Sequence, residues 1–186
     1  PVDWCKKALE FGFDHAGMVR AQDLECLPEV RDMCAADRCR AFGTRWTCPP
    51  GCGTLAECAA RLKEYGEGVL VQTTGILDDP FDADAMLETE RVHKVRFAAL
   101  AEAARAEADG CLPLGAGTCE LCPRCTYPDA PCRFPGRAVI SMEAYGLLVS
   151  SVCERAGVPY YYGPNTITYT SCVLFPRRHG ADTPIG

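Results

Sequence analysis

The sequence predicts an α/β or α+β fold, with a small central sheet, flanking helices and two cysteine-rich metal-binding loops. Predicted strands and helices alternate along the chain, as they do in both of these classes. Two segments rich in cysteine, glycine and proline, at 34–58 and 119–132, interrupt the alternation and predict folded loops. The 186 residues, 48% of them hydrophobic, fit a single domain over 1–186 with an ordinary core.

Apolar periodicity, capping residues and glycine breaks place the individual elements. The predicted helices have an apolar face or a capping signal, and they cover 2–12, 54–65, 82–108 and 141–157. The predicted strands are β-branched or bounded by glycine, and they cover 15–20, 68–75, 112–117 and 166–175. The pattern Thr54-Leu-Ala-Glu57 is a capping box, which opens the second helix.

The longest predicted helix follows a turn at 78–82 and has one apolar face. The residues of that face are Met86, Val92, Val95, Ala99, Leu100 and Ala103. His93 is on the same helix, and we interpret it as a partly exposed helical residue rather than as a ligand or a base. Glu143, near the start of the last predicted helix, is either a carboxylate favoured by the helix macrodipole or an acid beside a pocket.

The second cysteine loop contains the most informative motif of the chain. It reads C-E-L-C-P-R-C-T-Y-P-D-A-P-C, so Cys119, Cys122, Cys125 and Cys132 have the spacing Cys-x2-Cys-x2-Cys-x6-Cys. Iron–sulfur clusters are commonly held by such a compact run of three cysteines and one distal cysteine. Three prolines fix φ within the loop and keep it out of a helix. The motif therefore predicts a metal centre, and a [4Fe–4S] cluster in particular.

The first cysteine loop offers four more thiols with looser spacing. Cys34, Cys39, Cys48 and Cys52 follow one another as Cys-x4-Cys-x8-Cys-x3-Cys, and Cys48 precedes two prolines. A Cys-Pro step also ends ligand runs in ferredoxins. We therefore predict a second [4Fe–4S] cluster here. Cys58, on the predicted helix, competes with Cys52 for the fourth place.

Zinc and disulfides are the alternatives to iron–sulfur clusters. Structural zinc sites typically use two Cys-x2-4-Cys knuckles separated by a longer gap, which neither loop has. The 14 cysteines would also suit a disulfide scaffold, but they cluster in two segments instead of spreading along the chain. We favour iron–sulfur over zinc more strongly for the second loop than for the first.

Several segments resemble a known family. They are C-E-L-C-P-R-C-T-Y-P-D-A-P-C-R-F-P, S-M-E-A-Y-G, N-T-I-T-Y-T and R-W-T-C-P-P. The family is uncharacterised, is described only as predicted metal-binding proteins, and comes largely from anaerobic bacteria and archaea. The resemblance runs from about residue 34 to residue 175, and it implies Cys34, Cys39 and Cys48 as ligands. It leaves open whether the fourth ligand of the first centre is Cys52, Cys58 or neither, and it implies no reaction.

Charge and hydropathy indicate where the protein acts and with what. The formal net charge of −6, without a basic run, argues against binding to nucleic acid. No apolar stretch is long enough to span a membrane, and the printed start has neither the basic nor the apolar region of a secretory signal. We therefore expect the protein to act in the reducing cytoplasm of an organism that keeps oxygen away.

The sequence leaves three function classes open. The first is an electron-transfer protein with two [4Fe–4S] clusters and a redox partner protein, because no acid–base constellation is evident. The second is a reductase or lyase whose first cluster has an open iron site, with Glu143 or the segment Tyr160–Tyr162 as proton source. The third is a zinc-stabilised structural module. Whether the protein is an enzyme, and its oligomeric state, stay open.

Overall fold

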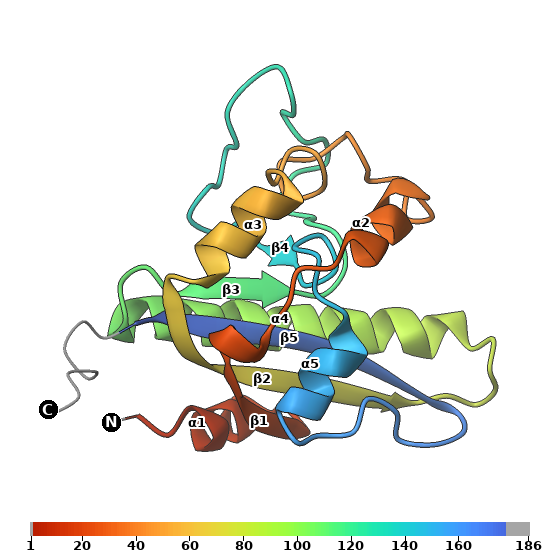
Figure 1. Ribbon diagram of the computed structural model, residues 1–186. Helices are drawn as coiled ribbons and strands as arrows, with labels where there is room; N and C mark the ends of the chain where they lie inside the picture. The colour runs from red at the N-terminus through yellow and green to blue at the C-terminus, as the bar shows by residue number, and fades with distance from the viewer. Residues whose placement is uncertain (1, 178–186) are drawn as a thin grey trace, which may run out of the picture.

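A five-stranded mixed sheet with helices on both faces forms the framework of the protein (Figure 1). The computed structural model describes residues 2–177. The strand order is β1-β2-β5-β3-β4, and all neighbouring strands are antiparallel except the pair β3–β4. The strands are β1 (His15–Arg20), β2 (Tyr65–Ile76), β3 (Leu112–Gly115), β4 (Ile140–Ser141) and β5 (Thr166–Pro176). The α+β alternative is therefore confirmed, with a small central sheet.

Within residues 2–177, three of the five helices begin at a residue whose side chain caps the first turn. The five helices are α1 (Trp4–Glu10), α2 (Pro28–Ala35), α3 (Leu55–Leu62), α4 (Ala83–Glu107) and α5 (Val149–Arg155), with a short 3₁₀ turn at Ala21–Asp23. Asp3 and Asp82 accept hydrogen bonds from backbone N–H groups of α1 and α4. The capping box at Thr54 and Glu57 is formed in full, which satisfies N–H groups that the first turn of α3 leaves free. The helix α2 was not among the sequence predictions.

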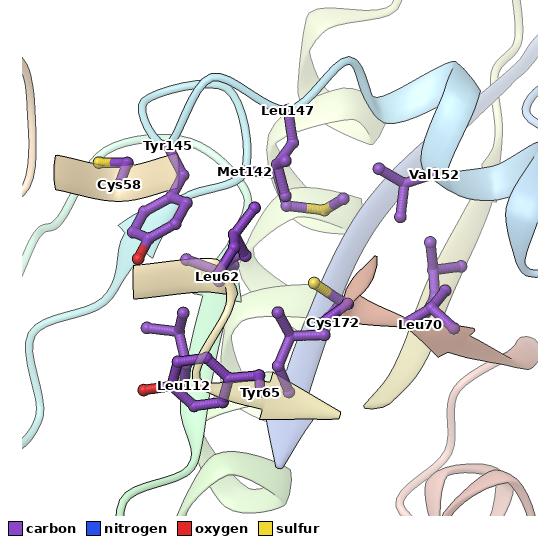
Figure 2. Packing of buried hydrophobic residues seen from close by; sticks show 14 of the residues in the cluster. Cys58, Leu62, Tyr65, Leu70, Leu112, Met142, Tyr145, Leu147, Val152 and Cys172 are labelled. Carbon is purple, nitrogen blue, oxygen red and sulfur yellow. The ribbon is translucent and has the colours of Figure 1, made fainter. Parts of the chain in front are cut away.

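Alternation along the central strands β2 and β5 divides the core into two clusters. Leu70, Cys172 and Leu174 belong to a first cluster, which α3, α5 and the segment 142–147 cover. Val69 and Val173 belong to a second cluster on the other face, which α1 and α4 cover. Figure 2 shows the first cluster, where Tyr145 and Leu62 lie above Leu112 and Tyr65. Both faces of the sheet are thus buried along β2 and β5.

The buried face of α4 differs from the predicted one. The buried residues are Thr89, His93, Phe97, Leu100, Ala101 and Ala104, so only Leu100 of the predicted face is among them. Val95 is 60% exposed and His93 is completely buried, so the prediction for His93 was wrong. The reason is that the sheet supplies hydroxyl partners for a buried imidazole, while alanines on both sides of α4 make the two faces similar in hydropathy.

The predicted helix over 141–157 is confirmed only in its second half, as α5. Ser141 ends β4 instead, and its hydroxyl accepts a hydrogen bond from the Ala144 N–H group. Gly146 has a positive φ of 91°, and a Cβ there would approach Leu55 Cδ1 to 2.5 Å. Because a left-handed glycine ends a helical run, the segment 142–146 forms turns. Glu143 is therefore not at a helix N-terminus, and its interpretation as a macrodipole carboxylate was wrong.

None of the helices within residues 2–177 combines the length and the hydropathy needed to cross a membrane.

Candidate metal centre

The four cysteines of the second loop line one pocket. They lie in the irregular segment 116–139, which connects the parallel strands β3 and β4. Cys119, Cys122, Cys125 and Cys132 all border this pocket. Figure 1 shows the segment as a long excursion away from the sheet, beside the segment that precedes α3. The spacing that predicted a common site is therefore matched by a common location.

The first loop supplies the other wall of the same pocket. Arg45, Trp46 and Thr47 line it together with the four cysteines. The guanidinium Nη1 of Arg45 donates to the Cys119 carbonyl at 2.9 Å, and the Trp46 indole N–H donates to the Ala130 carbonyl at 3.0 Å. The Trp46 ring also meets the Tyr127 ring edge-on, with centroids 4.9 Å apart. Sequence reasoning missed this contact, although the R-W-T-C-P-P segment carried part of the family resemblance.

The contact between the two loops leaves no room for a side chain at Gly51. A Cβ there would lie 2.5 Å from the Arg45 carbonyl oxygen and 2.9 Å from Tyr127 Cε2. The first of these neighbours is backbone, so the loop itself would have to move. Gly51 therefore sets how closely the first loop approaches the second.

We expect Gly51→Ala to loosen the pocket. Overpacking of this kind typically lowers the free energy of unfolding by about 1–3 kcal/mol, and it should also reduce the metal retained on a desalting column. Gly136→Ala is the matched control, because a Cβ at Gly136 meets no atom within 4 Å. Urea unfolding and metal analysis of both variants check the prediction. Equal metal retention in the two variants would contradict it.

The polar groups of the pocket fit a thiolate-bound metal group. Three buried side-chain polar atoms within residues 2–177 lack a hydrogen-bond partner: Arg45 Nε, Thr47 Oγ1 and, in the first core, Tyr145 Oη. The residues of the first two line the pocket. Buried donors are nearly always satisfied in folded proteins, and sulfur atoms of a bound cluster accept such hydrogen bonds.

Cys125 is the thiol best prepared to ionise. Burial opposes its ionisation, but backbone N–H groups of Tyr127, Trp46 and Thr126 and the charge of Arg45 outweigh burial. The pKa of Cys125 is therefore lowered from its ordinary value. Metals bind the thiolate and not the thiol. The backbone N–H of Trp46, a residue of the first loop, thus helps a predicted ligand of the second loop to ionise.

Three predicted ligands of the first loop lie near one another. Cys48 is buried, Cys34 is half-buried and Cys39 is exposed. Burial raises the pKa of Cys48, and the neighbouring Cys39 and Cys34 add to this effect. The repulsion between neighbouring thiolates is reduced when they bind the same cation. The arrangement is compatible with the three ligands that the resemblance implied.

Cys52 and Cys58 share a different neighbour, the guanidinium of Arg31. Arg31 Nη2 is 3.7 Å from Cys52 Sγ and 3.3 Å from Cys58 Sγ, while its Nε donates to the Ala144 carbonyl at 2.7 Å. Burial raises the pKa of Cys52 to about 11, although Arg31 opposes that change. The structure thus brings Cys52 and Cys58 to the same cation, and the choice between them as fourth ligand stays a prediction.

Glu143 is the acid that faces the first loop. Burial raises its pKa above the ordinary value, and its charge in turn raises the pKa of Cys34. The segment Tyr160–Tyr162, which was the other predicted proton source, makes different contacts. Tyr160 and Tyr161 are exposed, whereas the Tyr162 hydroxyl donates to Gln72 Oε1 at 2.6 Å and its ring stacks on His15. None of the three tyrosines lines the cysteine pocket.

Within the described part of the chain, no group of three or more His, Cys, Asp and Glu side chains is positioned to hold a single metal ion.

The sequence pattern of the family described as predicted metal-binding protein (DUF2284) matches residues 17–175. The chain belongs to this family. The DUF2284 match includes both cysteine loops, all of β2 and most of β5, and it confirms the resemblance.

Membership of the DUF2284 family describes this protein as a predicted metal-binding protein and specifies neither the metal nor a reaction. Comparison with curated proteins found no match, and neither did comparison with solved structures.

Proposed function

We propose that the protein is a cytoplasmic iron–sulfur protein that binds two [4Fe–4S] clusters and transfers electrons to a redox partner. The observation that carries this proposal is the pocket with four cysteines and two unpartnered polar atoms, from Arg45 and Thr47. Four thiolates and hydrogen-bond donors to sulfur are what such a cluster requires. The description of the DUF2284 family supports the binding of a metal.

The cysteines would divide between two centres. The second centre would use the four cysteines that line the pocket. The first centre would use Cys34, Cys39 and Cys48, with Cys52 as fourth ligand and Cys58 as its competitor. Each cluster would supply single electrons at a potential that burial and hydrogen bonds to sulfur adjust.

The contact between the two loops suits an electron relay. Arg45 and Trp46 come only three and two residues before Cys48 and contact the segment that contains the second set of cysteines. Rigid hydrogen-bonded segments of this kind would hold two centres at a fixed separation. Such a relay needs no catalytic base.

The charge of the loaded protein would favour a basic partner. The chain has a formal net charge of −6, and two clusters with their thiolates would bring it to about −10. Opposite charges on two proteins speed their encounter. We therefore expect a redox partner with a basic docking surface, and association that weakens as salt is raised.

The direct test is the iron and acid-labile sulfide content of protein purified without oxygen. Two clusters require about eight iron and eight sulfide atoms per chain, with spin-coupled EPR signals after reduction by dithionite. About four of each would leave one cluster. Colourless protein that contains zinc and little iron would refute the proposal and favour the structural zinc module.

A second candidate function is a reductase or lyase with an open iron site in the first centre. The contacts of Cys52 with Arg31 and with the Ala144 carbonyl favour it, because they occupy the thiol in other interactions. Glu143, beside Cys34, would be the proton source. Mild oxidation discriminates the two functions, since a cluster with only three cysteine ligands readily gives the EPR signal of a [3Fe–4S] centre. Absence of that signal would favour four ligands and electron transfer.

A further inference from the structure

An open cleft of about 610 Å³ lies beside the cysteine pocket of the second loop. It runs between α4 and the two ends of the segment 116–139, and Figure 1 shows that segment leaving the sheet at the end of β3, with α4 behind. Cys119 and Leu121 border both the cleft and the cysteine pocket. The volume is that of sites for small organic molecules. A molecule in the cleft would therefore contact the segment that carries the first predicted ligand.

The charges of the cleft are unevenly neutralised. Lys94 is fully engaged, because its ammonium forms ion pairs with Glu90 at 2.7 Å and with Glu120 at 2.8 Å. Arg105 and Arg137 also line the cleft, and neither has an ion pair with another residue in the range 2–177. Glu102 is the remaining carboxylate of the lining. The three cations and three carboxylates named here balance, and within residues 2–177 Arg105 and Arg137 are the cations of the cleft that form no ion pair.

The rest of the lining is largely apolar. Phe97 and Ala101 of α4, with Leu121 and Val139 of the segment 116–139, contribute apolar side chains to the lining. Gly115, at the end of β3, packs closely against both α4 and the segment 116–139, since a Cβ there would meet Val139 Cγ1 at 3.1 Å and Phe97 at 3.8 Å. Ligand sites typically combine such walls with a few polar groups that fix orientation. A free inorganic anion would leave the apolar walls unused.

We infer that this cleft binds a small organic acid, with its apolar body against Leu121 and Val139 and its carboxylate at Arg105 or Arg137. Arginine forms two parallel hydrogen bonds with a carboxylate, which makes it the usual partner for such a group. The inference goes beyond electron transfer to a protein partner, because it gives the second centre a small-molecule neighbour. It can be tested by binding alone, separately from iron content.

The test is isothermal titration of the metal-loaded protein with benzoate, a planar carboxylate, and with benzamide, its neutral analogue. We expect benzoate to bind at millimolar or lower concentration and benzamide to bind at least about tenfold more weakly, as loss of a charge-assisted hydrogen bond implies. Arg105→Gln and Arg137→Gln together should weaken benzoate binding by at least the same factor. Arg91→Gln is the matched control, because Arg91 is on the same helix, is exposed and is paired with Glu88.

Each other outcome overturns the inference. Undetectable benzoate binding refutes the site, and equal binding of benzamide refutes the role of the charge. Inorganic phosphate that competes as strongly as benzoate refutes the role of the apolar walls. A loss in Arg91→Gln as large as in the double variant indicates a general effect of net charge. Iron analysis and thermal unfolding of each variant separate these results from a loss of the metal centre or of the fold.

Discussion

Cys122→Ser should remove the second metal centre. Cys122 is the middle residue of the compact run and lines the pocket with the other three cysteines. A serine hydroxyl at this position stays protonated at neutral pH and is a poor ligand for iron, which prefers thiolate. We expect the variant to lose about four iron atoms per chain and most of the visible absorption of that centre. Metal analysis and absorption spectra of protein purified without oxygen measure both effects.

Cys111→Ser is the control for the cysteine prediction. Cys111 is half-buried against the second core cluster and lines neither the pocket nor the cleft. The exchange there changes one sulfur to oxygen without touching either loop, so the iron content should stay at the wild-type value. Full retention of iron in Cys122→Ser would show that the assignment of ligands is wrong.

His93 should make the protein sensitive to mild acid. Its Nδ1 is 3.0 Å from Thr73 Oγ1 and its Nε2 is 2.7 Å from Ser171 Oγ. Burial lowers the pKa of His93 from 6.5 to about 3, and the charges of Arg96 and Lys94 act in the same direction. Below pH 6.5, His93 therefore binds a proton in the unfolded chain but stays neutral in the folded chain. As the pH falls from 7 to 5, the free energy of unfolding should decrease by about 2 kcal/mol through this residue.

His93→Gln isolates this effect from all other titrating groups. Glutamine can keep one of the two hydroxyl contacts, so the variant should be less stable at pH 7 by about 1–3 kcal/mol. It should also lose less stability between pH 7 and pH 5 than the wild type, by about 2 kcal/mol. Urea unfolding followed by circular dichroism at both pH values, with both proteins in the same metal state, gives the difference. An unchanged pH dependence would refute the role of His93.

Local signals predicted most of the framework. Asp82 caps α4 and the Thr54–Glu57 box caps α3, as expected, because capping depends on residues three positions apart. The β-branched segment around Val69 and Val71 forms an interior strand for a similar reason, since its side chains suit a pleated and doubly buried surface.

The errors occurred where a residue depends on distant partners. Val95 was predicted to lie on the apolar face and His93 to be partly exposed, but the sheet offers Thr73 and Ser171 to an imidazole on the opposite side of the helix. The predicted helix through Gly146 failed because that glycine has a positive φ and packs closely against Leu55. Hydropathy and propensity contain no information about such contacts.

The sequence by itself determined that the fold combines helices with a small sheet, where helices are capped, the strand over 68–75 and the clustering of cysteines in two loops. It could do so because spacing and periodicity are properties of neighbouring residues. Only the tertiary structure decided that Arg45 and Trp46 of the first loop complete the pocket of the second, and that Arg31 joins Cys52 to Cys58. It also decided that a charged cleft lies beside Cys119. The physical reason is that these groups are far apart along the chain and meet only when burial of both faces of the sheet fixes where each loop returns.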